Sequence, residues 1–537
     1  MRSPLRRDLS ITIAVFVSGA VLLGVEIAAS RVLAPFFGNS LYVWGSLIGV
    51  VLAGLALGYW GGGHLADRSP SPVLLVVVIL LGGGGVLAIP LIDEPVLEAI
   101  VSWDPGPRLD PLIASIALFG LPSIVLAGVT PIAVRLRAVA LARLGSTAGS
   151  LFSVSTLGSI AGTFLTAFWL IPELGTDQLL GAAAVALFAG AAVVALAERQ
   201  ALPVVCAALA IGGATIVTVE LAPETGGRLT AASARNWSPV YRLRGEAPLG
   251  GRVDYVGFKV LYRKDTQYHR LAVVEDGTSR ILRFDSSFQS AMDLHDPFKT
   301  VYDYTDYLEL GLAYNPRAKN VLFVGLGGGS APKRVWRDFP ALRLHVVEID
   351  PVVAEVAHRF FGVPDDPRLV VTIQDGRRYL ATHRQRWDVI AIDTFYSDGV
   401  PFHMTTYEFM QLARTRLAPG GVIVTNLIGS VAGPGSKLFR SIYRTYRTVF
   451  PTVLVHPVRD GLGPPGSETL NLIVVATESP APAKTFLLAR WKGLRAKAPT
   501  APDLTIPIRN RLGTAVPIRD VPTLTDDYAP TDALLLD

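Results

Sequence analysis

The chain has 537 residues, of which 50% are hydrophobic and only 17% are charged, and its formal net charge is +5. This length exceeds that of an ordinary single domain, so at least two domains are expected. The single cysteine, Cys206, excludes a disulfide framework and a thiolate zinc site, and we expect no metal. The modest charge, with no basic stripe interleaved with aromatic residues, argues against nucleic acid as a partner.

The N-terminal half is predicted to be a multi-pass α-helical membrane domain with the lipid bilayer as its partner. Residues 1–221 contain about seven apolar runs of roughly 20 residues, the length that crosses a bilayer core. The runs lie at 10–30, 41–62, 72–92, 112–134, 147–172, 178–197 and 201–219.

Two features inside these runs bear on packing and charge. Glycines repeat at helix-face spacing, for example Gly58 with Gly62 and Gly158 with Gly162, which favours close helix contacts. Glu26 is the one carboxylate deep in the first run, and we expect it to pair with Arg31; a transport or substrate role is the alternative.

Loop charges predict an orientation. Arginines cluster near the N-terminus and in alternate loops, whereas the opposite loops are acidic, so the positive-inside rule puts the N-terminus in the cytoplasm. The loop GGGHLADRSPSP resembles a cytoplasmic loop of major facilitator transporters. An odd number of spans then places the C-terminal half outside, although the supply of a nucleotide cofactor favours the cytoplasm. The predicted location is the cell (inner) membrane.

The C-terminal half is predicted to be an α/β Rossmann-like domain of the class I methyltransferase-like type. A linker is expected at 222–252, a small β-rich part at 253–312 and the Rossmann-like domain at 313–537. Residues 269–275 and 279–284 flank Asp276-Gly277, as in a β-hairpin. From residue 319 short apolar runs alternate with amphipathic segments, which indicates βαβ units and a parallel sheet.

Polar residues and glycines follow the predicted strands at the edge where α/β proteins bind ligands. The first strand leads into Gly325, Gly327, Gly328 and Gly329, and a helix opens near Ala331, so a ligand can approach the backbone there. The next three strands end in acids that face the same edge. These are Glu348, placed for ribose hydroxyls, Asp375 with Gly376, placed for an adenine amino group, and Asp393. The pattern predicts an adenosine-containing ligand; Ser330 breaks the Gly-x-Gly-x-x-Gly spacing typical of NAD sites.

Taken together, these residues resemble the spermidine synthase (polyamine aminopropyltransferase) family, and more closely its membrane-fused, transporter-linked members. The resemblance covers residues from about 253 to 430, with SRVLAPFFGNSLYVW and LAGLALGYWGGGHLADR in the membrane half. It implies transfer of an aminopropyl group from decarboxylated S-adenosylmethionine to an amine such as putrescine, with release of methylthioadenosine. In this chemistry a carboxylate orients the amine and accepts its proton.

The resemblance also implies roles for particular residues. Asp393, aided by Tyr304, is the expected catalytic residue, and Gln289 is expected at the cofactor. Four residues are expected at the amine substrate: Tyr268, His269, Asp306 and Asp398. The chain departs from the family at His269, where soluble members carry Gln, and at Ser330, where they carry an Asp that holds the propyl end of the cofactor.

Two alternatives remain open at this level. One is a methyltransferase that uses intact S-adenosylmethionine; it would need neither the preceding hairpin part nor an acid at Asp393. The other is a nucleotide-sensing or polyamine-transporting protein with a non-catalytic synthase-like domain, which the transporter-like loop favours. A homodimer is compatible with either. In the C-terminal LTDDYAPTD, Asp526 and Asp527 are interpreted as a salt-bridged tail rather than as a cap over the amine site.

Overall fold

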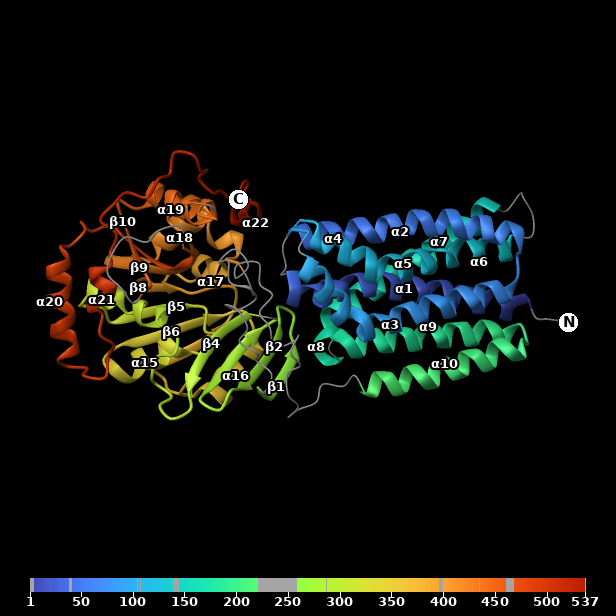
Figure 1. Cartoon of the computed structure of the whole chain (residues 1–537), viewed down its shortest axis with the longest axis horizontal. Helices are drawn as coiled ribbons and strands as arrows, with labels where there is room; N and C mark the ends of the chain where they lie inside the picture. The colour runs from blue at the N-terminus through green and yellow to red at the C-terminus, as the bar shows by residue number, and fades with distance from the viewer. Residues whose placement is uncertain are drawn as a thin grey trace. The chain divides into compact units, whose positions relative to one another are not determined.

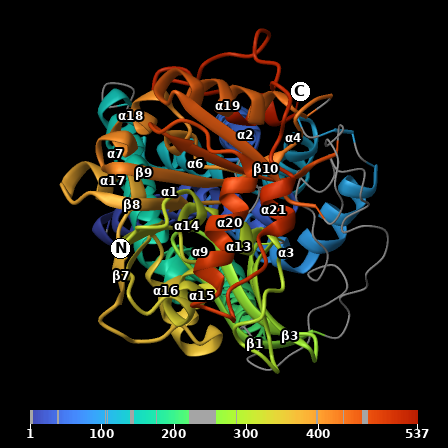
Figure 2. The same cartoon turned by 90° about the vertical axis from the view of Figure 1, so that its left-hand side faces the viewer.

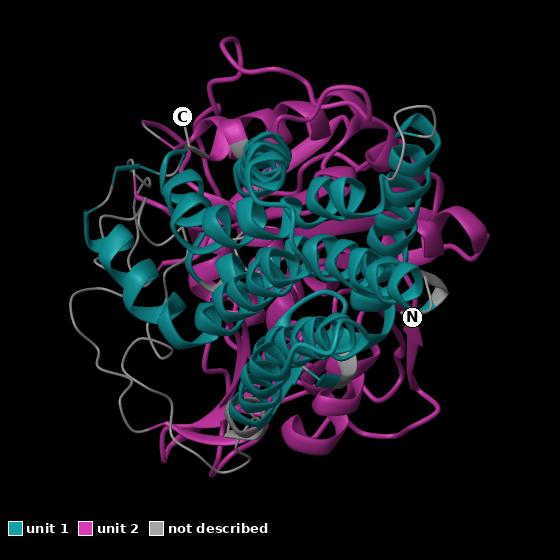
Figure 3. Ribbon diagram, turned by 90° about the vertical axis from the view of Figure 1, so that its right-hand side faces the viewer, with its two compact units in different colours: residues 1–225, 263–270 teal, residues 226–262, 271–537 magenta. Residues whose placement is uncertain are grey.

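The computed structural model describes residues 4–37, 41–103, 105–106, 108–138, 144–174, 176–220, 258–285, 287–395, 399–433, 435–459 and 468–536. The chain forms two compact units, which Figure 3 colours separately. Unit 1 contains residues 1–225 and 263–270, and unit 2 contains residues 226–262 and 271–537. The predicted linker at 222–252 lies outside the described residues, so its boundaries stay a prediction.

In unit 1 every predicted apolar run is helical (Figure 1). The helices are α1 (Pro4–Phe37), α2 (Leu41–Arg68), α3 (Pro72–Trp103), α4 (Asp110–Ser115), η1 (Ile116–Gly120), α5 (Leu121–Ala127), α6 (Val129–Arg137), α7 (Leu144–Leu165), η3 (Thr166–Leu170), α8 (Ile171–Leu174), α9 (Thr176–Ala197) and α10 (Ala201–Glu220). Among the described residues, 6 helical stretches are long and apolar enough to cross a membrane, and the last apolar helix, over Ala201–Thr215, is shorter. Six of the about seven expected spans therefore have the length and apolar character of a membrane-crossing helix, and the seventh expected span corresponds to the shorter α10.

Glycines allow the closest helix contacts in unit 1. A Cβ atom on Gly58 would lie 2.2 Å from the carbonyl oxygen of Ile124, and one on Gly162 would lie 2.0 Å from that of Ala20. Helix α2 therefore packs on α5, and α7 packs on α1, at a distance that only a residue without a side chain permits. The predicted use of these glycines as packing positions is confirmed.

Ion pairs join the arginine-rich ends of these helices. Arg7, near the start of α1, pairs with Glu198, just beyond the end of α9, at 3.1 Å. Arg135, near the end of α6, pairs with Asp67, near the end of α2, at 3.2 Å. These contacts agree with the loop charges that predicted one shared side for these helix ends.

The expected pair between Glu26 and Arg31 is wrong. Arg31 donates instead to the carbonyl oxygen of Gln267, a residue of the same unit, and no ion pair joins Arg31 to Glu26 among the residues described. The physical reason is the helical spacing, because side chains face each other at separations of three or four residues, not five.

Most residues of a small antiparallel sheet belong to unit 2. Its strands are β1 (Lys259–Asp265), β2 (Arg270–Glu275), β3 (Ser279–Phe284) and β4 (Ser287–Asp293), in that order. Strands β2 and β3 pair from Leu271 opposite Phe284 to Glu275 opposite Arg280. Gly277 in the turn has a φ of 94°, a conformation that favours glycine. The predicted hairpin is thus confirmed.

The larger part of unit 2 is a 7-stranded sheet in the order β10-β11-β9-β8-β5-β6-β7. Figure 1 shows β9, β8, β5 and β6 lying side by side. The strands are β5 (Asn320–Val324), β6 (Arg343–Glu348), β7 (Leu369–Ile373), β8 (Trp387–Ile392), β9 (Leu417–Gly429), β10 (Thr452–Pro457) and β11 (Leu470–Thr477). The order reverses between β5 and β8, and at such a point an open α/β sheet binds its ligand.

Helices cover both faces of this sheet. One apolar core joins it to α17 (Gly376–Thr382), α18 (Tyr407–Thr415) and α19 (Lys437–Val449). The other core joins it to α13 (Tyr304–Tyr307), α14 (Leu310–Tyr314), α15 (Ser330–Asp338), α16 (Pro351–Phe361), α20 (Lys484–Arg495) and α21 (Thr505–Arg509). Figure 2 shows α20 and α21 beside each other. Helix α22 (Thr531–Leu536) ends the chain's described part.

The sheet differs from the prediction at one edge. Strand β11 pairs antiparallel with β9, and β10 pairs antiparallel with β11, so the sheet is mixed rather than purely parallel. The long-range return of residues 452–477 to the sheet has no local sequence signal, because a buried antiparallel strand and a buried parallel strand have the same apolar pattern.

Candidate active site

The glycine turn after β5 approaches β8 and β4 closely. Gly325 has a φ of 98°, and a Cβ atom there would lie 2.1 Å from the carbonyl oxygen of Asp393. The N–H of Gly328 donates to the hydroxyl of Ser290 in β4 at 2.9 Å. Gly327 and Gly329 also have positive φ values. The turn therefore brings the ends of β5 and β8 together, and contact of a ligand with its backbone stays a prediction.

Glu348, at the end of β6, is a buried carboxylate held by backbone donors. Its Oε2 accepts from the N–H of Leu326 at 3.0 Å, and its Oε1 accepts from that of Asp350 at 2.9 Å. Burial raises the pKa of Glu348, whereas these donors oppose the rise. An ionised carboxylate has about four acceptor positions, more than these backbone donors occupy, and the role of Glu348 towards ribose hydroxyls stays a prediction.

Asp375, at the end of β7, is held by a helix and a histidine. Its Oδ1 accepts from the N–H of Arg378 at 2.8 Å and so caps α17. Its Oδ2 lies 3.1 Å from Nε2 of His403. The bond with His403 lowers the pKa of Asp375. A Cβ atom on Gly376 would lie 2.3 Å from Val324, so this glycine lets α17 start against β5.

Asp393, directly after β8, is held by two side-chain donors. Its Oδ1 accepts from Nδ2 of Asn426 in β9 at 2.9 Å, and it also accepts a hydrogen bond from Tyr304. Burial raises the pKa of Asp393 to about 6, although both hydrogen bonds lower it. A carboxyl group with a pKa near neutrality is suited to accept a proton at physiological pH.

Tyr304 links Asp393 to the small sheet. Its hydroxyl lies 3.4 Å from the carbonyl oxygen of Gln289 in β4, besides its bond to Asp393. The structure therefore brings together Tyr304, Gln289 and Asp393, three residues that the family resemblance selects from separate parts of the sequence.

Asp306 has a different environment. Its Oδ1 lies 2.6 Å from Arg334 of α15, and Arg334 also binds the buried Glu309 at 2.7 Å. Burial raises the pKa of Glu309 to about 7. The charge of Asp306 is thus compensated by Arg334, and its role towards a cationic substrate stays a prediction.

The other predicted substrate residues are Tyr268, His269 and Asp398. Tyr268 and His269 belong to unit 1, where the N–H of each donates to the hydroxyl of Thr266 at 3.0 Å. Burial, with Arg31 nearby, lowers the pKa of His269 to about 3, so this imidazole is neutral. Asp398 lies outside the described residues. The roles of all three stay predictions.

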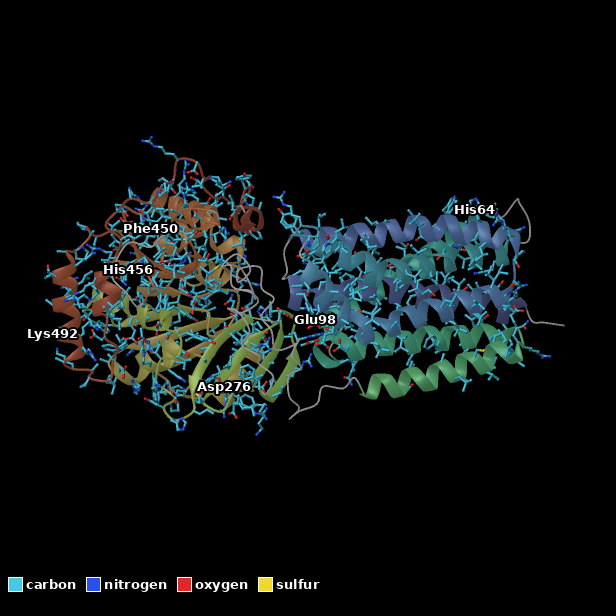
Figure 4. All side chains as sticks on the ribbon, viewed as in Figure 1. His64, Glu98, Asp276, Phe450, His456 and Lys492 are labelled. Atoms are coloured by element: carbon cyan, nitrogen blue, oxygen red, sulfur yellow. The ribbon has the colours of Figure 1, made fainter. Side chains whose placement is uncertain are left out.

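The C-terminal acid Asp526 is salt-bridged, as expected. Arg377, next to Gly376, donates to it at 2.7 Å, and Thr406 donates to it at 2.7 Å. His456, labelled in Figure 4, is a histidine of unit 2 that the site does not use. Its ring nitrogens bond Tyr314 at 2.9 Å and the carbonyl of Pro507 at 2.8 Å, so it holds the fold together.

The sequence reasoning missed Asn426 and Asn471. Asn426 is 2% exposed and donates to Asp393, and Nδ2 of Asn471 in β11 donates to Oδ1 of Asn426 at 3.0 Å. The signal for Asn426 was present, since it is a polar residue inside the apolar run GGVIVTNLI. Asn471 lies in a similar apolar run, LNLIVVAT, but nothing in that run indicates that it meets Asn426, about 45 residues earlier in the chain.

Fold and site together define the class of protein. A glycine turn after the first strand, a buried acid at the tip of the second and further acids at the next tips make a Rossmann-like domain of the methyltransferase type. The small antiparallel sheet before it contributes backbone and side chains to the glycine turn.

Comparisons with known proteins narrow this class to a family. A family model described as the spermine/spermidine synthase domain matches residues 304–458. The polyamine aminopropyltransferase of Vibrio vulnificus is 31% identical over 199 residues, which are 36% of this chain and 65% of that protein. That of Chromobacterium violaceum is 30% identical over 229 residues, 42% of this chain and 81% of that protein. The crystal structure of spermidine synthase from Thermotoga maritima is 23% identical, with a TM-score of 0.36, over 44% of this chain and 78% of that one.

The chain belongs to the polyamine aminopropyltransferase (spermidine synthase) family. The family resemblance read from the glycine turn and the strand-end acids is therefore confirmed.

Proposed function

We propose that this protein is a membrane-bound polyamine aminopropyltransferase. The observation that carries the proposal is the Asp393 site, where a half-buried carboxyl with a pKa of about 6 meets Tyr304 beside the glycine turn. In the proposed reaction the amine nitrogen forms a bond to the propyl carbon beside the sulfonium. The carbon–sulfur bond breaks, methylthioadenosine leaves with the electron pair, and Asp393 accepts the proton of the amine.

The residues present are compatible with decarboxylated S-adenosylmethionine as the group donor. Glu348 would take the ribose hydroxyls, Asp375 and Gly376 would adjoin the adenine, and the turn at Gly325 would lie beside the sulfonium end. Asp393, at the end of the neighbouring strand, would face the amine. Alignment of the two reactants in line supplies much of the rate acceleration in such a substitution.

Purified full-length protein in lipid nanodiscs tests the proposal. With putrescine as acceptor, release of methylthioadenosine from decarboxylated S-adenosylmethionine is expected, and Asp393→Asn should abolish it. Release of S-adenosylhomocysteine from intact S-adenosylmethionine would instead support methyl transfer. Tight nucleotide binding without either product would support the sensor alternative.

Membrane attachment is part of the proposal. Large apolar side chains are exposed along several helices of unit 1, for example Leu52 at 58%, Leu157 at 59% and Phe164 at 53%. Exposed apolar surface of this extent is typical of a contact with lipid. If the protein stays with membranes after alkaline carbonate washing, the proposal holds; release into the supernatant would contradict it.

The side of the membrane on which unit 2 lies depends on whether α10 crosses the bilayer. Six crossings from a cytoplasmic N-terminus return the chain to the cytoplasm, where nucleotide donors are available, whereas a seventh crossing by α10 places unit 2 outside. We propose the cytoplasmic placement on cofactor supply, with the inner membrane as location.

A further inference from the structure

We infer that Asn426 and Asn471 are positioning residues of the acceptor-amine site, which hold Asp393 through neutral amides so that its charge stays available to the substrate. The inference rests on the proposed function and adds two residues to it. It stands on the hydrogen-bonded row that runs from Asn471 to Asn426 to Asp393.

The donors and acceptors of this hydrogen-bonded row can be arranged in only one way when Asp393 is ionised. A carboxylate oxygen accepts hydrogen bonds and cannot donate when ionised, so Asn426 must present its NH2 group to Asp393. The carbonyl of Asn426 then points the other way and receives the NH2 group of Asn471 at 3.0 Å. Asn471 thereby fixes which end of the Asn426 amide faces Asp393.

Strand pairing places these amides on one face of the sheet. Asn471 lies opposite Ile428, and Ile473 lies opposite Asn426, in the antiparallel pair β9–β11. Residues two positions apart on a strand share a face, so Asn426 and Asn471 are diagonal neighbours. Strand β9 pairs with β8, and Ile392, the last residue of β8, lies opposite Thr425. The next residues of the two strands, Asp393 and Asn426, are therefore neighbours.

The side-chain partners of Asp393 differ in charge from those of two other acids, Asp306 and Asp526. Asp306 pairs with Arg334, and Asp526 pairs with Arg377. Asp393 has Asn426 and the phenol of Tyr304 instead, and no charged group contributes to its pKa among the residues described. Among the residues that the structure describes, Tyr304 is the titratable group hydrogen-bonded to Asp393.

Neutral partners suit both tasks proposed for Asp393. An arginine or lysine partner would compensate the carboxylate and hold its pKa low, which would make it a weak proton acceptor and a poor partner for an ammonium group. Amide donors fix the carboxylate in place and leave its negative charge for a cationic amine. The acceptor class that this site fits is therefore an amine that arrives as a cation and gives up its proton at Asp393.

The test is the pH dependence of kcat/KM in Asn426→Leu and Asn471→Leu. Loss of a donor to the ionised carboxylate raises its pKa, so the acid limb of the profile should move to higher pH by about one unit in Asn426→Leu, and by less in Asn471→Leu. The KM for the nucleotide should stay the same. The double variant should shift no further than Asn426→Leu, because Asn471 acts through Asn426.

Thr425→Val is the matched control. Thr425 is the preceding residue of β9, points to the opposite face, and bonds the hydroxyl of Tyr446. Its loss should leave the acid limb in place. The inference is overturned if the profiles of both asparagine variants coincide with the wild type, or if the shifts of the double variant are the sum of the single ones. Asn471→Leu keeps the test open should Asn426→Leu fail to fold, because Asn471 is only partly buried.

A second readout separates this inference from the proposed function. The carboxyl stretching band of Asp393, identified by its loss in Asp393→Asn, can be titrated by infrared spectroscopy without turnover. If the wild type transfers no aminopropyl group but Asn426→Leu raises the pKa of Asp393 measured by this band, the proposed function is refuted and the positioning role stands. An unchanged pKa overturns the positioning role, whatever the activity.

Discussion

Replacement of Asp393 by Asn should stabilise unit 2 at neutral pH while it removes activity. The folded-state pKa of Asp393 is about 6 against an ordinary 3.8. The folded protein therefore binds this proton more tightly than the unfolded chain, and stability falls as pH rises from about 4 to about 6. A rise of about two units corresponds to about 3 kcal/mol at higher pH.

The amide introduced by Asp393→Asn would resemble the neutral acid. Its oxygen can accept from Asn426, as the carboxylate does, and no charge is left to desolvate. We expect a gain of up to about 3 kcal/mol at pH about 8 that disappears near pH about 4. The expected gain in the variant equals the stability that the wild type loses by keeping a partly desolvated, ionised carboxylate at this position.

Hydrogen exchange with mass spectrometry provides the assay, because it reports on peptides of β5, β8 and β9 in the full-length protein. A gain of about 3 kcal/mol slows exchange roughly 100-fold where exchange requires unfolding of the sheet. Asp503→Asn is the control. The pKa of Asp503 is lowered by its bond to Thr505, so its replacement should bring no gain at neutral pH. Equal protection of wild type and Asp393→Asn between pH about 5 and 8 would refute the reasoning.

Three other experiments test further features of the structure. Glu348→Gln places an amide donor against the N–H of Leu326 or Asp350, so nucleotide affinity measured by calorimetry should fall by about 1–3 kcal/mol; unchanged affinity would exclude Glu348 from the site. Gly325→Ala should fail to bind nucleotide, because its Cβ would lie 2.1 Å from a carbonyl oxygen, and a normal binding isotherm would contradict this. A reporter fused after residue 537 should be active in the cytoplasm, whereas activity outside would show that α10 crosses the membrane.

Much of the molecule is determined locally. The apolar runs specify the helices of unit 1 because bilayer thickness sets their length. The glycine turn at Gly325 and the acids Glu348 and Asp393 could be assigned from the sequence, because each follows a strand directly and parallel strands end at one edge.

Only the tertiary structure decided which of these groups meet. It compensates Asp306 with Arg334 and places Asn426 and Asn471 behind Asp393. The contacts of Asn471 depend on the antiparallel pairing of β11 with β9, and that of Asp306 depends on the packing of α15 against α13. Such long-range contacts leave no periodic signal in the sequence of either partner. The sequence by itself therefore determined the family, the glycine turn and the acids that follow the strands. The neutral hydrogen-bond partners of Asp393, on which its proposed role as a base depends, are residues that the fold brings together.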